Sequence, residues 1–204
     1  LTTTGSKTTT ANIAKKDVTL TAIAANNKTY DGNQAAVIAN GTLTGTVGAE
    51  TLLVSGTGTF DTANAGTPKT VTVSNFAALT KTDGTNGGLW SNYNLANSTP
   101  ITTTATITKK DVTLTTLSAS NKTYDGTTAA NITSGVITDT VGSETLLISG
   151  SGTFADQHAA DGKTVTVADV TTLTQANGTG DWNNYTLTTT GSKTTTANIA
   201  KKDV

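Results

Sequence analysis

The 204-residue sequence contains no cysteine, methionine or arginine. Without cysteine the chain can form neither disulfides nor thiolate metal sites, so its stability depends on packing and strand pairing. Aromatic residues make up only 4% and charged residues only 13% of the chain, whereas about a quarter of an ordinary domain is charged. Threonine takes the place of much of the missing charge. With 34% hydrophobic residues, many of them alanine, we expect two small domains with thin cores.

Charge and hydropathy exclude two further classes of protein. The chain has 13 lysines against 14 acidic residues, and this sparse, balanced charge disfavours nucleic-acid binding. The longest apolar run, residues 35–39, is far shorter than the roughly 20 residues of a membrane-spanning helix. No basic and then apolar leader opens the sequence. We therefore expect a soluble fragment from within a longer protein, with no membrane insertion.

The sequence is internally repeated. Residues 15–80 and 109–174 share 39 identities in 66 ungapped positions, counted at an offset of 94. The offset then becomes 92, so that Trp90 and Tyr93 match Trp182 and Tyr185. Residues 1–18 are also identical to residues 187–204. We therefore expect a tail strand of a preceding module over 1–14, repeat 1 over 15–108, repeat 2 over 109–200 and the start of a following module over 201–204.

The pattern within each repeat is that of β-strands. Apolar and polar residues alternate in 18–21, 71–73, 104–107 and 164–167, which is the period of a half-buried strand. Threonine favours extended backbone because its Cβ is branched. The sequence predicts an all-β fold of two tandem β-sandwich-like modules with six or seven short strands each. The alternative is a β-grasp-like module with residues 33–39 as one short helix.

The linker between the repeats is expected to be short. Only Thr108, Lys109 and Lys110 separate the predicted last strand of repeat 1 from the predicted first strand of repeat 2. So short a linker leaves little room for independent tumbling, and we expect an extended rod.

Several motifs recur in the same order in both repeats. They are Lys-Thr-Tyr-Asp-Gly, Gly-x-Gly-Thr-Phe, Lys-Thr-Val-Thr-Val, Asn-Tyr-x-Leu and Thr-Ala-x-Ile near a Lys-Lys start. This combination resembles the YDG repeat modules of large secreted bacterial adhesins, which often carry a filamentous-haemagglutinin-like secretion domain. The recurring motif residues are Tyr30, Asp31, Gly32, Phe60, Trp90 and Tyr93, then Tyr124, Asp125, Gly126, Phe154, Trp182 and Tyr185. The resemblance implies an extracellular, β-rich stalk at a bacterial cell surface or in a biofilm matrix.

The sequence offers little for chemistry. Its one histidine, His158, has Asn64 as its counterpart, so we interpret it as a surface-loop residue. No catalytic elbow, phosphate loop or zinc spacing is present, and we expect no enzyme and no cofactor. Four carboxylates recur, and each repeat needing the same turn explains them equally well: Asp31, Asp125, Glu50 and Glu144.

Three other kinds of site have candidate residues in the sequence. Calcium would need six to eight oxygen ligands, and the nearest candidate is the segment 83–86, opposite Asn177 and Asp181. An isopeptide bond could involve Lys28 with Asn27 or Asp31. The recurring aromatic residues could stack on sugars, but with so few in the chain we interpret them as core residues, with Trp90 and Trp182 in equivalent buried places.

Two interpretations of function remain. The first is a non-catalytic spacer that holds a distal adhesive domain away from the cell. The second is a binding module that recognises a glycan or another copy of itself. Residues 61–68 and 155–162 share only Ala65 with Ala159, so the repeats differ most in a loop, where a ligand would be bound. This difference favours the spacer, whose partners are the neighbouring repeats of the same chain. The segment 1–14 is expected to be extended and held by repeat 1 or by a neighbouring molecule, while 187–200 pairs within repeat 2.

Overall fold

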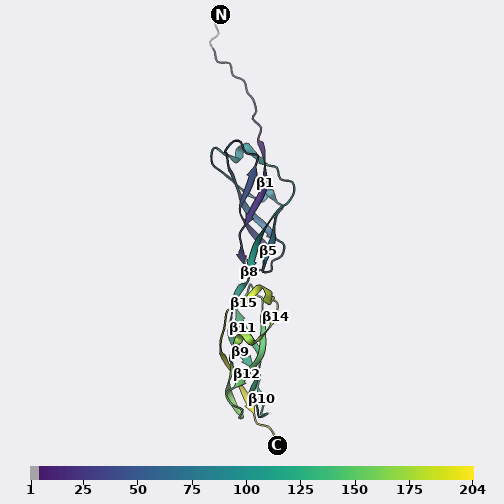
Figure 1. Ribbon diagram of the computed structural model, residues 1–204, viewed down its shortest axis with the longest axis vertical. Coiled ribbons are helices and arrows are strands. Elements are labelled where there is room, and N and C mark those ends of the chain that lie inside the picture. The colour runs from purple at the N-terminus through teal and green to yellow at the C-terminus, as the bar shows by residue number, and fades with distance from the viewer. Residues whose placement is uncertain (1–4) are drawn as a thin grey trace. The chain divides into compact units, whose positions relative to one another are not determined.

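The computed structural model describes residues 5–204 and shows an all-β chain. Repeat 1 has eight strands (Figure 1), namely β1 (Lys16–Ala25), β2 (Lys28–Thr29), β3 (Ala35–Thr44), β4 (Leu52–Phe60), β5 (Gly66–Val73), β6 (Thr80–Asp83), β7 (Tyr93–Leu95) and β8 (Ile101–Thr108). Repeat 2 has the same eight, namely β9 (Lys110–Ala119), β10 (Lys122–Thr123), β11 (Ala129–Thr138), β12 (Leu146–Phe154), β13 (Ala160–Val167), β14 (Thr174–Asn177), β15 (Tyr185–Leu187) and β16 (Lys193–Ala200).

Short 3₁₀ turns are the only helical elements of residues 5–204. They are η1 (Phe76–Ala78), η2 (Trp90–Asn92), η3 (Val170–Thr172) and η4 (Trp182–Asn184). The alternative of a β-grasp-like module with a short helix over 33–39 is therefore wrong, because residues from Ala35 onward form β3 with alternating buried and exposed side chains. Alanine permits either structure, and packing of Ala36 and Ile38 into the core selects the strand. No described helix has the length and apolar character to cross a lipid bilayer.

Each repeat forms one curled sheet. The strand order is β2-β8-β5-β4-β3-β1-β7 in repeat 1 and β10-β16-β13-β12-β11-β9-β15 in repeat 2, with β6 on β4 and β14 on β12. Most neighbours are antiparallel, but β2 with β8 and β1 with β7 are parallel. In repeat 2 the sheet curls until β16 approaches β9, where the Thr195 hydroxyl donates to the Leu117 carbonyl at 2.7 Å. The prediction of two tandem all-β modules is confirmed, with eight strands in each where six or seven were expected.

The long strand β4 changes partner near Gly56. Its first half pairs with β6 and its second half with β3. Gly56 has φ +147, and a Cβ there would lie 3.1 Å from Leu79 Cδ2. Gly150 repeats this arrangement with φ +155. A glycine is required at both positions because other residues rarely adopt this φ.

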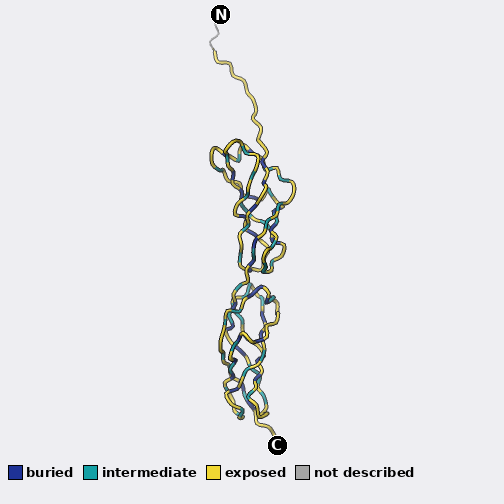
Figure 2. The backbone as a smooth tube through the Cα atoms, viewed as in Figure 1, coloured by how far each residue is buried: buried dark blue, intermediate teal, exposed yellow. Residues whose placement is uncertain are grey.

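Most buried hydrophobic residues lie in the strands of the two repeats (Figure 2). In repeat 2 the core cluster consists of Leu114, Leu117, Ala130, Ile132, Ile148, Phe154, Val165, Val167, Val170, Leu173, Ala197 and Ile199. Phe60 and Phe154 are the largest of the fully buried side chains. The expectation that scarce aromatic residues fill thin cores is met by these two phenylalanines.

The described chain divides into two compact units that do not coincide with the sequence repeats. The first unit comprises the described residues up to Asn26, with Gln34–Asp61 and Pro68–Ala105. The second comprises Asn27–Asn33, Thr62–Thr67 and Thr106–Val204. Two loops of repeat 1 therefore belong, by their contacts, to the second unit. Within that unit Lys109 alone separates β8 from β9.

The segment that precedes β1 carries no strand. Residues 5–15 are exposed, and Ile13 is 100% exposed, whereas Ile199, its counterpart in β16, is buried. Residues 1–4 lie outside the described residues. The expectation that repeat 1 holds this segment is not met over residues 5–12, which are exposed and carry no strand, whereas Ile13 and Ala14 line a cavity together with residues of repeat 1. The expected pairing of the 187–200 segment within repeat 2 is confirmed by β16, which lies between β10 and β13.

Candidate functional site: a tyrosine and glutamate cluster

The Lys-Thr-Tyr-Asp-Gly motif forms a tight turn after β2. Asp31 Oδ1 accepts a hydrogen bond from the Asn33 backbone N–H at 3.1 Å, and Lys28 Nζ lies 2.7 Å from the same oxygen. Gly32 takes φ +78, which closes the turn at little steric cost. Partial burial raises the pKa of Asp31, but the hydrogen bonds from Lys28 and Asn33 outweigh it and hold the pKa below its usual value. The turn fixes Tyr30 at its start.

The second copy of the motif forms the same turn. Asp125 Oδ1 lies 2.8 Å from Lys122 Nζ and accepts from the Thr127 N–H at 2.9 Å, and Gly126 takes φ +76. The hydrogen bond from Lys122, followed by that from Thr127, lowers the pKa of Asp125 to about 2. The motif is therefore a self-contained turn whose aspartate is committed to the lysine and to the backbone.

Within the second unit Tyr30 packs into a cluster with Tyr185 and Glu144. The Tyr30 hydroxyl donates to Glu144 Oε1 at 2.8 Å, and the Tyr185 hydroxyl donates to Glu144 Oε2 at 2.6 Å. The two rings meet edge to face with centroids 5.4 Å apart, an arrangement favoured by the ring quadrupoles. Val141 N–H donates to the Tyr185 hydroxyl at 3.0 Å. One carboxylate thus joins two tyrosines that are far apart in the sequence.

A buried asparagine extends the cluster. Asn184 is 2% exposed, and its Oδ1 accepts from the Ala65 N–H at 2.8 Å. Its Nδ2 donates to Asn64 Oδ1 at 3.2 Å. The 62–67 loop is held here because a buried amide needs both its donor and its acceptor satisfied. No buried side-chain polar atom of residues 5–204 is left without a partner.

Burial and the shared carboxylate keep both tyrosines protonated. Desolvation, with the hydrogen bond to Glu144, raises the pKa of Tyr30 to about 12. The same two causes raise the pKa of Tyr185. Ionising either hydroxyl would place a second negative charge beside Glu144 with less water to solvate it. The cluster is a set of neutral donors around one charged acceptor, suited to holding segments together.

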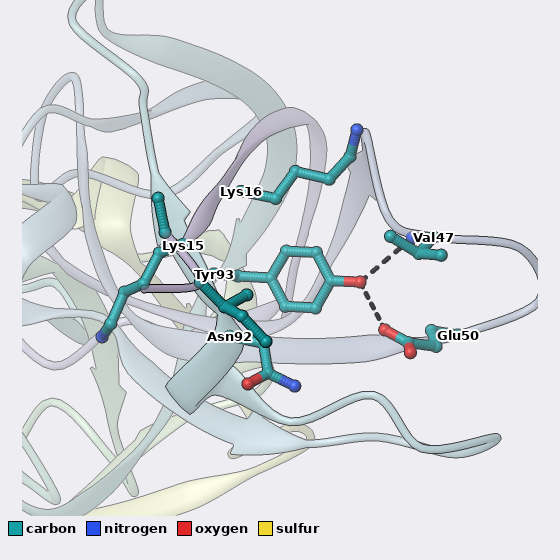
Figure 3. A pocket seen from close by; sticks show the side chains of 8 residues that line it. Lys15, Lys16, Val47, Glu50, Asn92 and Tyr93 are labelled. Carbon is teal, nitrogen blue, oxygen red and sulfur yellow. Dashed lines mark hydrogen bonds between the residues drawn. The ribbon is translucent and has the colours of Figure 1, made fainter. Parts of the chain in front are cut away.

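The first unit contains the counterparts of Glu144 and Tyr185, namely Glu50 and Tyr93, but no second tyrosine contacts Glu50 within the described residues. Tyr93 is buried and its hydroxyl donates to Glu50 Oε2, while Val47 N–H donates to that hydroxyl at 3.0 Å (Figure 3). The hydrogen bond to Glu50, followed by burial, raises the pKa of Tyr93. Beside these groups lies an open cavity of about 410 Å³. It is lined by Ile13, Ala14, Lys15, Lys16, Val47, Glu50, Asn92 and Tyr93.

The remaining aromatic motif residues are mostly structural. Phe60 and Phe154 lie in the cores. Trp90 and Trp182 begin η2 and η4, and each indole Nε1 donates to the carbonyl of the equivalent leucine, Leu53 or Leu147, at 3.1 Å. Their places are equivalent as predicted, although Trp182 is buried and Trp90 only half-buried. Tyr124 differs from Tyr30 and is 37% exposed.

The candidate calcium segment is occupied by structural hydrogen bonds. Asp83 Oδ1 accepts from the Trp90 N–H at 2.7 Å, and Asn86 Nδ2 donates to the Ala49 carbonyl at 2.9 Å. In repeat 2, Asn177 Oδ1 takes the place of Asp83 as acceptor for Trp182. Residues 5–204 contain no group of three or more His, Cys, Asp or Glu side chains arranged to hold a metal ion.

Two other predicted positions are exposed. His158 lies in a loop, where its N–H donates to Asp156 Oδ1 at 2.8 Å. Lys28 and Asp31 form an ion pair whose carboxylate is 45% exposed, whereas an isopeptide bond would need a buried setting. The structure brings Tyr30 and Tyr185 together, whereas the sequence predicts only that each of them is a core residue. It also assigns Asn184 a role that only the repeated Asn-Tyr pair could have indicated.

Comparison with known proteins gives one positive result. The model of the YDG domain family matches residues 14–103 and again residues 108–198. No curated protein matches the chain, and no solved structure matches it. Because the two matches together cover most of the sequence, the chain belongs to the YDG domain family and carries two tandem copies of its domain.

Proposed function

We propose that the chain is a non-catalytic structural repeat, a stalk or spacer, of a large bacterial surface or biofilm-matrix adhesin. In this role it lies outside the cell, and its tandem modules hold a distal adhesive domain away from the surface. Its partners are neighbouring repeats of the same chain. The proposal is supported by the two family domains in tandem and by the resemblance of their motifs to adhesin modules.

One observation carries this proposal above the others. In the second unit the polar residues that recur in the repeats hold segments together, as Glu144 does between Tyr30 and Tyr185. Asn184 and the two Asp-Lys turns are likewise committed to intramolecular partners. A module that worked by binding a small ligand would leave such groups unpartnered in a cavity. A module that works by holding its neighbours in place would use them as this chain does.

Among the binding alternatives, contact with another copy has a specific observation in its favour. The cavity of the first unit is lined by Glu50 and Tyr93, which are the counterparts of the residues that hold Tyr30 in the second unit. A glycan site has no comparable support, because Phe60, Tyr93, Phe154 and Tyr185 are buried. Self-contact is therefore the second candidate function.

The spacer function is tested by changing the number of repeats. An adhesive reporter domain is displayed on bacteria behind one, two or four copies of residues 15–200, and binding is measured on receptors buried under polymer layers of increasing thickness. We expect the thickness at which binding is lost to increase with the number of copies. An unrelated β-rich spacer of equal length serves as the control and should restore binding.

Two results would contradict the proposal. Binding that does not depend on the number of copies would show that reach is not the contribution of the repeats. Binding of the purified chain itself to the receptor or to a glycan surface would transfer the adhesive role to the repeats.

A further inference from the structure

We infer that the cavity beside Tyr93 in the first unit is a docking site for the Tyr124-Asp125-Gly126 turn of a second copy of this chain. The site consists of Val47, Glu50, Asn92 and Tyr93 and is called the socket below. The inference deepens the proposed function, because it names the surface by which repeats recognise one another. It depends on that proposal only for its biological setting.

The second unit shows what the socket can hold. Every socket residue has an identical counterpart there: Val141, Glu144, Asn184 and Tyr185. These four surround the turn that carries Tyr30. Two of them contact Tyr30 directly, and a Cβ placed on Gly32 would lie 3.1 Å from Val141 Cγ1. The chain thus contains one filled and one open version of the same site.

Equivalent residues of the two repeats differ in exposure, as expected if one site is filled and the other is open. Asn184 is buried, whereas Asn92 is exposed. Val47 is 55% exposed, whereas Val141 is only partly exposed. On the side of the turn, Tyr30 is 6% exposed against 37% for Tyr124. The surfaces that differ are therefore the two complementary halves of one contact.

The hydrogen-bonding groups of the two halves also match. Glu50 accepts from Tyr93 on Oε2, as Glu144 accepts from Tyr185. Glu144 Oε1 accepts from Tyr30, but no group of residues 5–204 donates a hydrogen bond to Glu50 Oε1. Nor does the Tyr124 hydroxyl form a hydrogen bond within the described part of the chain. One unused donor and one unused acceptor correspond to the bond that Tyr30 makes.

The turn of the second copy can enter without disturbing either sheet. In the second unit Tyr30 N–H donates to the Thr108 carbonyl at 2.8 Å, so β8 lies beside the turn. In the second copy Tyr124 N–H makes the same bond to Ala200 of its own β16. Two exposed segments without a strand lie next to the contacting surfaces, residues 5–14 beside the socket of one copy and 201–204 beside Tyr124 of the other. Both can be displaced, and the docked pair then resembles the second unit with a chain break between Ala200 and Lys15.

Such a contact is heterologous, because the socket and the turn lie on different parts of the chain. After two copies pair, one of them still has a free socket and the other a free turn, so the contact produces open head-to-tail assemblies. Between repeats of one long chain the same contact is favoured by the high effective concentration of linked modules.

The test uses sedimentation velocity of the full chain at concentrations up to about 1 mM, because a contact of this kind between free chains is expected to be weak. We expect species larger than a monomer to increase with concentration. Tyr124→Ala removes the turn's aromatic anchor and should weaken association at least about tenfold, as buried interface tyrosines do. Val47→Lys places a charged side chain at the rim of the socket and should have the same effect. Val136→Lys is the matched control, because Val136 is 54% exposed and lies outside the socket.

Mixing the two defective chains distinguishes docking from general stickiness. The Tyr124→Ala chain keeps its socket and the Val47→Lys chain keeps its turn, so an equimolar mixture should form a 1:1 dimer and nothing larger. Circular dichroism melting of each variant checks that its fold is intact, and both residues are exposed enough for this to hold.

Three results would overturn the inference: no association of the unaltered chain in this range, association that is unchanged in both variants, or a mixture that forms no dimer. Any of these would leave the repeat-number experiment on the spacer function unaffected, so the two proposals fail independently.

Discussion

Glu144 is the residue on which the cluster of the second unit depends, because each of its carboxylate oxygens accepts from a different tyrosine. A hydrogen bond to a charged group contributes more than a neutral one, about 1.5 to 3 kcal/mol. Its counterpart Glu50 has the same relation to Tyr93 alone. The equivalent glutamates therefore differ in role: Glu144 joins two tyrosines, whereas Glu50 binds one.

Removing one hydroxyl tests this difference. Tyr30→Phe leaves Glu144 Oε1 without its donor, and we expect the second unit to lose about 1 to 2 kcal/mol of unfolding free energy. Tyr124→Phe is the matched control and should change the free energy by less than about 0.5 kcal/mol, as most exposed substitutions do. Urea denaturation followed by circular dichroism measures both. Equal losses in the two variants would contradict the assignment of Tyr30 to a buried cluster.

The raised pKa of Tyr30 predicts a dependence of stability on alkaline pH. The pKa of the hydroxyl is near its ordinary value of 10.0 in the unfolded chain and about 12 in the folded chain. Because the folded pKa is raised, the stabilisation is fully present below pH 10 and is lost as the pH rises toward 12. The melting temperature of the second unit should therefore decrease as the pH is raised from 10 to about 12. In the Tyr30→Phe variant this decrease in melting temperature should be smaller. A decrease of the same size would show that other groups cause it.

At the scale of the strand, glycine sets how closely neighbouring strands and side chains pack. A Cβ on Gly135 in β11 would lie 2.5 Å from Ile148 Cγ2 and 2.6 Å from Leu114 Cδ1, both in the core. Gly41 occupies the same place in β3, where a Cβ would lie 2.4 Å from Leu20 Cδ1. The thin cores are therefore filled to the backbone at these positions.

Gly135→Ala should be destabilising despite the small size of the added group. The two core side chains must leave their positions to admit it, and overpacking of this kind costs about 1 to 3 kcal/mol. Thermal unfolding measures the effect. Gly5→Ala is the control, because a Cβ on Gly5 meets nothing within 4 Å, and it should leave the transition unchanged. A neutral Gly135→Ala would show that β11 can move away from β12.

The strands could be predicted from the sequence because their signal is local. Alternation in 18–21 and 104–107 indicated β1 and β8. Residues 33–39 were ambiguous, since alanine does not distinguish a helical turn from a strand that packs into a core. The cluster could not be predicted in the same way. Tyr30 and Glu144 are 114 positions apart, and two copies of a motif look alike whether one of them is buried or exposed.

At the scale of the whole molecule, the two copies of one sequence have different surroundings. Residues 1–14 and 187–200 are identical in sequence, yet 5–14 form no strand while 193–200 form β16 with Ala197 and Ile199 in the core. Sequence alone therefore does not decide the structure of this segment. The sheet that is available to it does.

Deleting each copy should have opposite consequences. Removal of residues 1–14 should leave the melting temperature of both units unchanged, because the described part of this segment is exposed. Removal of residues 187–200 should unfold repeat 2, since β16 pairs with both β10 and β13. Differential scanning calorimetry compares the two chains. If the first deletion lowered the melting temperature as severely as the second, the domain frame would have to begin at residue 1.

The division of the chain into units also determines the order in which a growing chain can complete its fold. Tyr30 forms its hydrogen bond with Glu144, which follows 114 residues later, and Ala65 forms its hydrogen bond with Asn184, which follows 119 residues later. When a chain emerges with its N-terminus first, as in synthesis, the sheet of one repeat can therefore close before Tyr30 and Ala65 have these partners. They acquire their partners only when the next repeat has emerged and folded. In a tandem array with this property, each repeat forms its last hydrogen bonds only after the next repeat has emerged. If synthesis stops early, only the last repeat to emerge lacks these bonds, and all the repeats before it are complete.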